Sequence, residues 1–435
     1  MPFSQARPAK TRSPLARRRI LWGIAMDVST HDLRTLFAAR MLRMFAYGII
    51  GVVLVLYLVQ RGLNETRIGL LLTFTLLGDA AISLWLTTHA DRWGRRKAIM
   101  AGAALMIAGG AAMAMTGDFG WLLVAATIGV ISPTGNEVGP FLAVEQACLA
   151  QVIVDRHRTR IFAWYNVAGY AATALGALAG GTGATALQRM GWSMLASYQA
   201  LFGAYAAVGG ILLVLCGRLS SAVEAPPRVV PAGARLFLGL HESRGLVARL
   251  SALFALDAFG GGFILQSVVA YWLHQKFQVD EATLGAVFFG TNILSGVSAL
   301  AAVPLARRIG LVNTMVWTHL PSNLVLMAVP LMPTFPLAVA ALLVRHMLSQ
   351  MDVPTRQSYV NAIVPPAERS AANGVTGTAR QFAAALAPTI AGTVLGVAAL
   401  TGVPFFAAGG LKIVYDLNLW RMFRTVKPPE ETSAA

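Results

Sequence analysis

Apolar runs of about 20 residues recur along almost the whole chain, and no other feature restricts its fold as strongly. A helix of that length spans the hydrocarbon core of a bilayer. We predict twelve such helices, at residues 34–60, 67–88, 98–116, 121–150, 160–187, 194–217, 246–274, 282–304, 311–332, 335–363, 371–398 and 401–422. The sequence therefore predicts an all-α polytopic membrane protein.

The composition agrees with this prediction. Of the 435 residues, 56% are hydrophobic and 12% are charged, which is about half the charged share of a typical soluble protein. A soluble fold has no interior large enough to bury so much apolar side chain. Two cysteines are too few for a disulfide scaffold, and glycine and proline follow no collagen-like period.

The net charge of +16 is unevenly distributed. Most basic residues lie before the first predicted helix, in the loops after the second and fourth helices, and between the sixth and seventh. The opposite ends of the helices carry only Arg61, Arg67, Arg189 and Lys276. Because basic loops remain in the cytoplasm, we expect both termini to be cytoplasmic. The expected location is a cell membrane, the inner membrane of a bacterium.

The longest hydrophilic interruption divides the predicted helices into six and six. It contains Pro226, Pro227 and Pro231 and five arginines. The predicted segments are a basic cytoplasmic tail (1–33), an N-terminal six-helix bundle (34–217), a cytoplasmic central loop (218–245), a C-terminal six-helix bundle (246–422) and a cytoplasmic tail (423–435).

An internal repeat relates the two halves. Without gaps, Glu145-Gln146-Ala147 aligns with Arg356-Gln357-Ser358, and the same offset places 176–181 on 387–392. Repeats of this kind are typical of transporter folds. The alignment predicts that helices four and five are copies of helices ten and eleven.

A second, looser alignment relates the first helix to the seventh. It places Arg43 opposite Asp257 and Gly48 opposite Gly262. After a slip of two residues, Gly69 also matches Gly285. The two alignments together predict two pseudo-symmetric bundles.

A charged loop with the sequence Asp91-Arg92-Trp93-Gly94-Arg95-Arg96-Lys97 joins the second and third predicted helices. Gly94 permits a tight turn, and the basic residues keep the loop in the cytoplasm. An aspartate at such a turn caps a helix or accepts from an arginine. With the six-plus-six layout, this loop resembles the D-R-x-G-R-R signature of the major facilitator superfamily.

The resemblance implies two bundles that rock about a central site, as in secondary transporters that work by alternating access. It also implies a gate in which Asp91, Arg92, Gly94, Arg95 and Arg96 latch one conformation against the eleventh helix. Two departures bear on this latch. Thr87 stands where the family has glycine, and the second-half counterpart, Arg307-Arg308-Ile309-Gly310, lacks the aspartate, so we expect a latch in the first half only.

The fifth helix carries Gly176, Gly180 and Gly181 in a run that resembles an eroded antiporter motif, G-P-x-x-G-G, with Ala177 in place of proline. The resemblance favours export. Small residues at this spacing also serve ordinary close packing between helices, so that alternative stays open.

Ionisable residues within a spanning helix are costly and mark cavities or pathways. Glu137 lies in Ser132–Pro140, where two prolines and two glycines open the backbone. A carboxylate beside such a break can bind a proton, because protonation removes most of its desolvation cost. The proton-coupling candidates are therefore Glu137 and Asp257, followed by Asp79.

Further charged residues are candidates for the gate or for the central cavity. We predict that Glu145 meets Arg95 or Arg96 and belongs to the gate. The candidates for the substrate cavity are Arg43, Arg345, Asp352, Arg356 and Arg380. On the tenth helix, Arg345 and Asp352 are seven residues apart and therefore share a face.

Two pairings can be predicted from position. Arg43 and Asp257, at symmetric positions, are expected to form a salt bridge or to exchange partners as the cavity changes side. The alternative is that each pairs within its own half. Lys412 and Asp416 are four residues apart on the twelfth helix and are expected to pair with each other.

These features predict a secondary active transporter, with proton-coupled efflux of small amphipathic compounds as the first hypothesis. Proton-coupled uptake of a small metabolite or organic anion is the alternative. An intramembrane enzyme is disfavoured because the seven histidines have no metal-ligand spacing, and nothing supports a receptor. We expect a monomer that contacts lipid, substrate and protons, with no cofactor, no metal and no nucleic acid. The lack of a G-x-x-x-x-G-K-S/T loop argues against ATP as the energy source.

Overall fold

A computed structural model places the chain in two bundles of helices and describes residues 30–137, 141–153, 155–224, 240, 242–365 and 368–426. The α-helices are α2 (Thr30–Gln60), α3 (Glu65–Trp93), α4 (Arg95–Met115), α5 (Phe119–Ile128), α6 (Phe141–Val152), α7 (Asp155–Arg189), α8 (Met194–Gly217), α9 (Arg244–Gly262), α10 (Gln266–Phe277), α11 (Glu281–Ile309), α12 (Leu311–Ala328), α13 (Phe335–Ser349), α14 (Asp352–Ile363), α15 (Arg369–Leu395) and α16 (Val403–Phe423). Short 3-10 helices are η1 (Ser221–Val223), η2 (Val329–Leu331) and η4 (Ala398–Leu400). No strand occurs among these residues, and the all-α prediction is confirmed.

Three of the twelve predicted spans are each built from two helices: the fourth from α5 and α6, the seventh from α9 and α10, and the tenth from α13 and α14. In the fourth span, Pro133 and the left-handed Gly135 (φ 67°) interrupt the backbone hydrogen bonds, as predicted. In the tenth span, Pro354 has no N–H to donate to the carbonyl of Gln350, and α13 ends one residue earlier. Seven helical stretches of the described chain qualify as membrane spans by length and composition alone.

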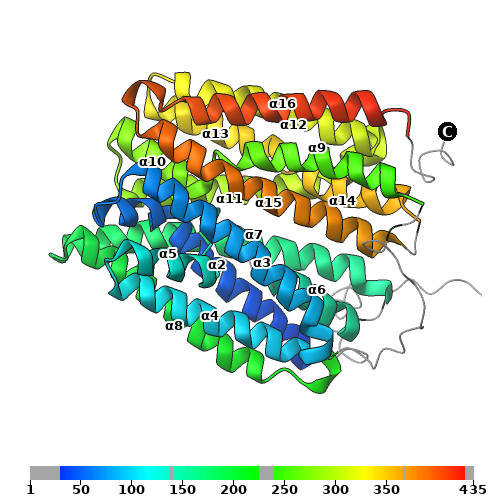
Figure 1. Ribbon diagram of the computed structural model, residues 1–435, viewed down its shortest axis with the longest axis horizontal. Coiled ribbons are helices and arrows are strands. Elements are labelled where there is room, and N and C mark those ends of the chain that lie inside the picture. The colour runs from blue at the N-terminus through cyan, green and yellow to red at the C-terminus, as the bar shows by residue number, and fades with distance from the viewer. Residues whose placement is uncertain are drawn as a thin grey trace, which may run out of the picture.

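The two halves form two layers (Figure 1). In the first half, α2 packs along α7 and α4 along α8; in the second half, α9 packs along α15 and α12 along α16. The halves meet where α7 contacts α11 and where α3 contacts α15. The fold is therefore the predicted pair of six-helix bundles.

The start of α2 and the end of α16 lie at the same end of the bundles, which we call the terminus end (Figure 1). The other end, which we call the hairpin end, carries short connections such as residues 61–64 and 278–280. Much of the predicted tails and of the predicted central loop falls outside the described residues.

The predicted repeat is visible in how equivalent glycines pack. A Cβ at Gly48 in α2 would overlap the carbonyl of Thr173 in α7, and a Cβ at Gly262 in α9 would overlap the carbonyl of Ala384 in α15. The two alignments pair Gly48 with Gly262 and Thr173 with Ala384. The same close helix contact therefore occurs once in each half.

Candidate functional site

A buried charge cluster in the first half is built around Arg43 of α2, whose side chain is 0% exposed. Arg43 donates from Nη1 and Nη2 to the two carboxylate oxygens of Glu145 in α6, at 2.5 and 2.8 Å. Its Nε donates to Oε1 of Glu137 at 2.9 Å. A bidentate pair of this kind fixes both side chains firmly.

Arg40 and Tyr165 complete this first-half cluster. The Nη1 of Arg40 lies 2.8 Å from Oε2 of Glu137, and its guanidinium stacks 4.4 Å from the ring centroid of Tyr165. The hydroxyl of Tyr165 donates to Glu145. Two arginines therefore balance two glutamates. Glu137 is the more accessible carboxylate, with 12% of its side chain exposed against 0% for Glu145.

The predicted contact of Glu145 with Arg95 or Arg96 is replaced by a pairing with Arg43. A fully buried guanidinium needs a carboxylate partner, because leaving its charge uncompensated costs several kcal/mol. Glu145 therefore belongs to the interior of the first half rather than to the loop.

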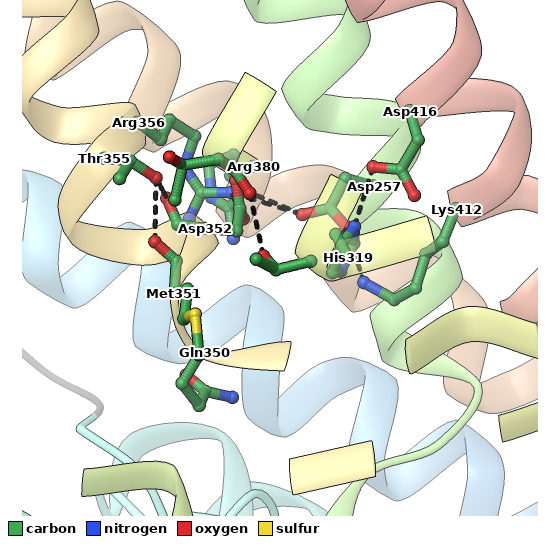
Figure 2. A network of polar contacts seen from close by, with 12 residues as sticks. Asp257, His319, Gln350, Met351, Asp352, Thr355, Arg356, Arg380, Lys412 and Asp416 are labelled. Atoms are coloured by element: carbon green, nitrogen blue, oxygen red, sulfur yellow. Dashed lines mark hydrogen bonds and ion pairs between the residues drawn. The ribbon is translucent and has the colours of Figure 1, made fainter. Parts of the chain in front are cut away.

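A second buried cluster surrounds Asp257 of α9 in the second half (Figure 2). Its Oδ1 lies 2.5 Å from Nζ of Lys412 in α16. Its Oδ2 lies 3.0 Å from Nη1 of Arg380 in α15 and 3.4 Å from Nη1 of Arg356 in α14. Arg356 also binds Asp352 at 2.6 Å. The carboxylate of Asp257 thus contacts cationic groups from three helices.

Asp416 accepts from other residues than the predicted Lys412. Its Oδ1 lies 2.9 Å from Nδ1 of His319 (Figure 2). Its Oδ2 accepts from Nδ2 of Asn323 at 2.9 Å. The rule that residues four apart pair with each other describes exposed helix faces, whereas Lys412 and Asp416 are both buried against neighbouring helices. The sequence did not identify His319 as a site residue. Asn323, one helical turn further along α12, contacts the same carboxylate.

Arg43 and Asp257 pair within their own halves in this conformation, which is the alternative to the predicted bridge. The pairs themselves are symmetric. The repeat aligns Arg43 with Asp257 and Glu145 with Arg356, and the structure joins Arg43 to Glu145 and Asp257 to Arg356. The two halves therefore share one salt bridge with its charges exchanged.

Arg345 of α13 is separated from Asp352 by the break in the tenth span. Its Nη1 hydrogen-bonds Nε2 of His346 at 3.1 Å. No ion pair joins Arg345 to a carboxylate anywhere in the described part of the chain. The predicted charged stripe of the tenth helix thus divides into a paired part, Asp352 and Arg356, and a separate arginine.

The loop that resembles the family signature turns at Gly94, whose φ of 108° is accessible mainly to glycine. The backbone N–H groups of Arg95 and Arg96 donate to the carboxylate of Glu224 at 2.6 and 3.3 Å. The Arg95 side chain donates to the carbonyls of Ala147 and Val223. Arg92 is exposed, and the side chain of Asp91 lies outside the described residues. The loop is thus anchored to the start of the central loop.

Glu224 caps α4 from a distance, because Gly94 has no side chain to do so. We expect Glu224→Gln to destabilise the protein by about 1 kcal/mol, the typical contribution of an N-cap. The midpoint of thermal unfolding can be followed with a thiol-reactive dye, because Cys148 and Cys216 are buried in this half and react when it unfolds. Glu242→Gln is the matched control because the Glu242 side chain is exposed. Equal midpoints for both variants would contradict the capping role.

The helix-five glycines divide between two neighbours. Added Cβ atoms at Gly176 and Gly180 would clash with the α2 backbone, so both serve packing inside the first half. Gly181 instead faces the second half, where its Cβ would lie 2.9 Å from the Cα of Gly285.

Asp79, the third proton-coupling candidate, is buried in α3, with 7% of the residue exposed.

A second glycine contact between the halves mirrors the first. A Cβ at Gly392 of α15 would lie 2.9 Å from the Cα of Gly69 in α3. The repeat aligns Gly181 with Gly392 and Gly285 with Gly69, so the two contacts are images of each other. Both lie toward the hairpin end. There Tyr271 also donates to Glu65 at 2.8 Å, and Tyr198 donates to Glu281.

The breaks in the fourth and seventh spans meet across the interface. The N–H of Ser267, in the first turn of α10, donates to the carbonyl of Pro133 at 3.1 Å. A first-turn N–H has no partner within its own helix, and the carbonyl was freed by the break. Each half thus satisfies a backbone group of the other.

Comparisons with known proteins agree with this architecture. The family model described as Major Facilitator Superfamily matches residues 36–271 and 250–435. An uncharacterized membrane protein of Saccharomyces cerevisiae is 29% identical over 429 residues, which cover 92% of this chain and 96% of the yeast protein.

Solved structures show the same fold. A bacterial homolog of the human lysosomal transporter Spinster, in an inward-facing and occupied conformation, has a TM-score of 0.71 at 15% identity and covers 92% of this chain and 98% of its own. A mutant of the nucleoside transporter NupG has a TM-score of 0.70 at 16% identity, over 90% and 99%. A D-xylose-proton symporter has a TM-score of 0.66 at 13% identity, over 89% and 97%.

Proposed function

The chain belongs to the major facilitator superfamily and is a transporter rather than an enzyme, and we propose that it exports small amphipathic compounds by proton-coupled alternating access. The mirrored glycine contacts, Gly181 with Gly285 and Gly392 with Gly69, carry this proposal. They let the two bundles close tightly at the hairpin end, and rocking of one bundle against the other would open that end.

The charge distribution supports an orientation in which the hairpin end faces outward. The basic loops lie at the terminus end, which remains in the cytoplasm by the positive-inside rule. With the hairpin end closed, the transporter is in an inward-facing conformation, in which solute can enter or leave only on the cytoplasmic side.

Glu137 is the proposed proton carrier. Asp257 is bound by three cations and Glu145 by a bidentate arginine, so protonating either would leave buried positive charge. Protonating Glu137 removes the one ion pair that Arg40 makes among the described residues, but Arg40 stays stacked on Tyr165 and Arg43 keeps Glu145. The partial exposure of Glu137, and its place after the break in the fourth span, favour it further.

Inverted vesicles with an imposed pH gradient test the coupling. Addition of a transported compound is expected to discharge the gradient, and a protonophore is expected to stop uptake of the compound into the vesicles. Glu137→Gln should abolish gradient-driven transport and retain ligand-induced thermal stabilisation, whereas Glu137→Asp should retain both. Gradient-driven transport by Glu137→Gln would exclude Glu137 as the carrier.

Export is the first hypothesis, and uptake of a small metabolite or organic anion is the alternative. The same vesicle preparation separates the two directions. Export from the cell appears as accumulation in inverted vesicles when their interior is acidic. Accumulation only in right-side-out vesicles with an acidic exterior would establish uptake.

A further inference from the structure

Arg345, within the tenth span, forms no ion pair in the described part of the chain. In the first-half cluster, two arginines face two glutamates. In the second half, Arg356, Arg380 and Lys412 face Asp257, Asp352 and Asp416, and His319 lies between Asp257 and Asp416. Arg345 is half-buried and stands outside this set of contacts. A cation held away from water without an ion-pair partner is costly, so its presence calls for a reason beyond stability.

The residue that Arg345 contacts cannot supply the missing negative charge. The hydroxyl of Ser295 donates to the carbonyl of Thr291 at 2.8 Å, so it accepts from Nδ1–H of His346 at 2.9 Å. The other ring nitrogen, Nε2, then carries the lone pair that accepts from Nη1 of Arg345. His346 is thus neutral, and it orients the guanidinium without balancing it.

The guanidinium also retains an unused donor. The Nε–H of Arg345 is buried and has no hydrogen-bond partner among the described residues. Within this part of the chain, the Arg345 side chain makes one hydrogen bond, which uses Nη1. An arginine binds a carboxylate or sulfonate through two parallel N–H groups, and the edge that contains Nε is one of the edges that can do so.

The guanidinium lies on the side of the tenth span that faces the first half. His346 and Gln350 are four residues apart and share a helix face. Gln350 accepts from the hydroxyl of Tyr170 in α7 at 3.4 Å, so this face borders the other bundle. Because Arg345 reaches round to bond His346, its positive charge lies beside the interface that opens and closes.

We propose that Arg345 binds the negative group of the transported compound, which makes the substrate an amphipathic organic monoanion such as a carboxylate or a sulfonate. This inference rests on the proposed function and gives its substrate class. One arginine without an ion-pair partner offers its charge to one negative group, and it would repel an organic cation.

Thermal unfolding of the purified full-length protein, with naphthalene compounds that differ only in charge, tests the site. A ligand that binds the folded state raises the melting temperature. Naphthoate and naphthalenesulfonate are expected to raise it in a concentration-dependent way, whereas naphthamide and a naphthylmethyl-trimethylammonium salt are expected to leave it unchanged. Arg345→Gln should abolish the anion effect, and Arg345→Lys should keep part of it.

The variant is expected to fold, because Arg345→Gln removes a half-buried charge that makes no ion pair among the described residues. Its melting temperature without ligand should equal or exceed that of the wild type, whereas Arg356→Gln, which breaks two ion pairs, should lower it. The site assignment is overturned if the anions fail to stabilise the wild type, or if they still stabilise Arg345→Gln.

Flux of radiolabelled naphthoate into proteoliposomes separates this inference from the proposed function. Binding that depends on Arg345 without any flux would uphold the site and contradict transport of this class. Flux of the ammonium compound without stabilisation by the anions would uphold transport and overturn the anion site.

Discussion

Asp257→Asn is expected to destabilise the protein by about 3–5 kcal/mol, the usual cost of removing one partner from a buried ion network. The carboxylate of Asp257 lies within 3.4 Å of nitrogen atoms of Lys412, Arg380 and Arg356. An asparagine of the same shape keeps the packing and removes the charge. Lys412 and Arg380 then have no acidic partner among the described residues, while Arg356 keeps Asp352. Thermal unfolding in detergent, followed by tryptophan fluorescence, measures the loss.

Asp352→Asn is the matched control for this prediction. Among the described residues, Asp352 forms an ion pair with Arg356 only, and Arg356 retains Asp257, so the loss should be clearly smaller. The double variant Asp257→Asn/Lys412→Met should recover part of the stability, because it removes the more buried of the two cations that the single variant strands. A single variant as stable as the wild type, or a double variant less stable than the single, would refute the account of this cluster.

Much of the fold could be predicted because a bilayer imposes a simple rule on sequence. Each span must be apolar and long enough, and the apolar runs therefore marked the helices before any packing was known. The internal repeat predicted more than topology. It aligned Gly181 with Gly392 and Gly69 with Gly285, and these four glycines form the two equivalent contacts between the halves.

The partners of the buried charges were harder to predict from sequence. Arg43 and Asp257 occupy equivalent positions, but equivalence under a two-fold axis does not imply contact. In the structure, Asp257 pairs with Arg356 of the tenth span. Arg43 pairs with Glu145 of the fourth span, which the repeat aligns with the tenth. Symmetry therefore predicted correctly which residues correspond and incorrectly which residues touch.

Local spacing failed for a different physical reason. Arg345 and Asp352 share a face only if the tenth helix is continuous, and it breaks before Asp352. Pro354 gave the signal for this break, since a proline inside a span removes one backbone hydrogen bond. His319 gave no comparable signal, because its role depends on Asp416 from a helix that is distant in sequence.

Gly392→Leu and Gly181→Leu are expected to abolish transport while leaving a folded protein that still binds ligand. Even a Cβ at either position would lie 2.9 Å from the Cα of the opposing glycine and would overlap the carbonyl of Glu65 or Glu281. A leucine therefore prevents closure at the hairpin end. If alternating access requires this closure in every cycle, transport should fall to background.

The position of the bundles can be measured through Thr389, whose hydroxyl bonds that of Thr73 at 2.8 Å across the contact. In a background lacking Cys148 and Cys216, Thr389→Cys should react slowly with a membrane-impermeant maleimide. The addition of Gly392→Leu should speed the reaction, because the hairpin end is then held open. Label added to right-side-out vesicles reaches this end if it faces outward.

Gly377→Leu is the matched control, since Gly377 lies on the same helix and a Cβ there would meet nothing within 4 Å. It should transport and label like the parent protein, which separates the effect of the close contact from the effect of adding a side chain to α15. Normal transport by Gly392→Leu would mean that the hairpin end need not close during the cycle. The mirrored glycines would then serve only to hold the two bundles together, and the proposed mechanism would lose the observation that carries it.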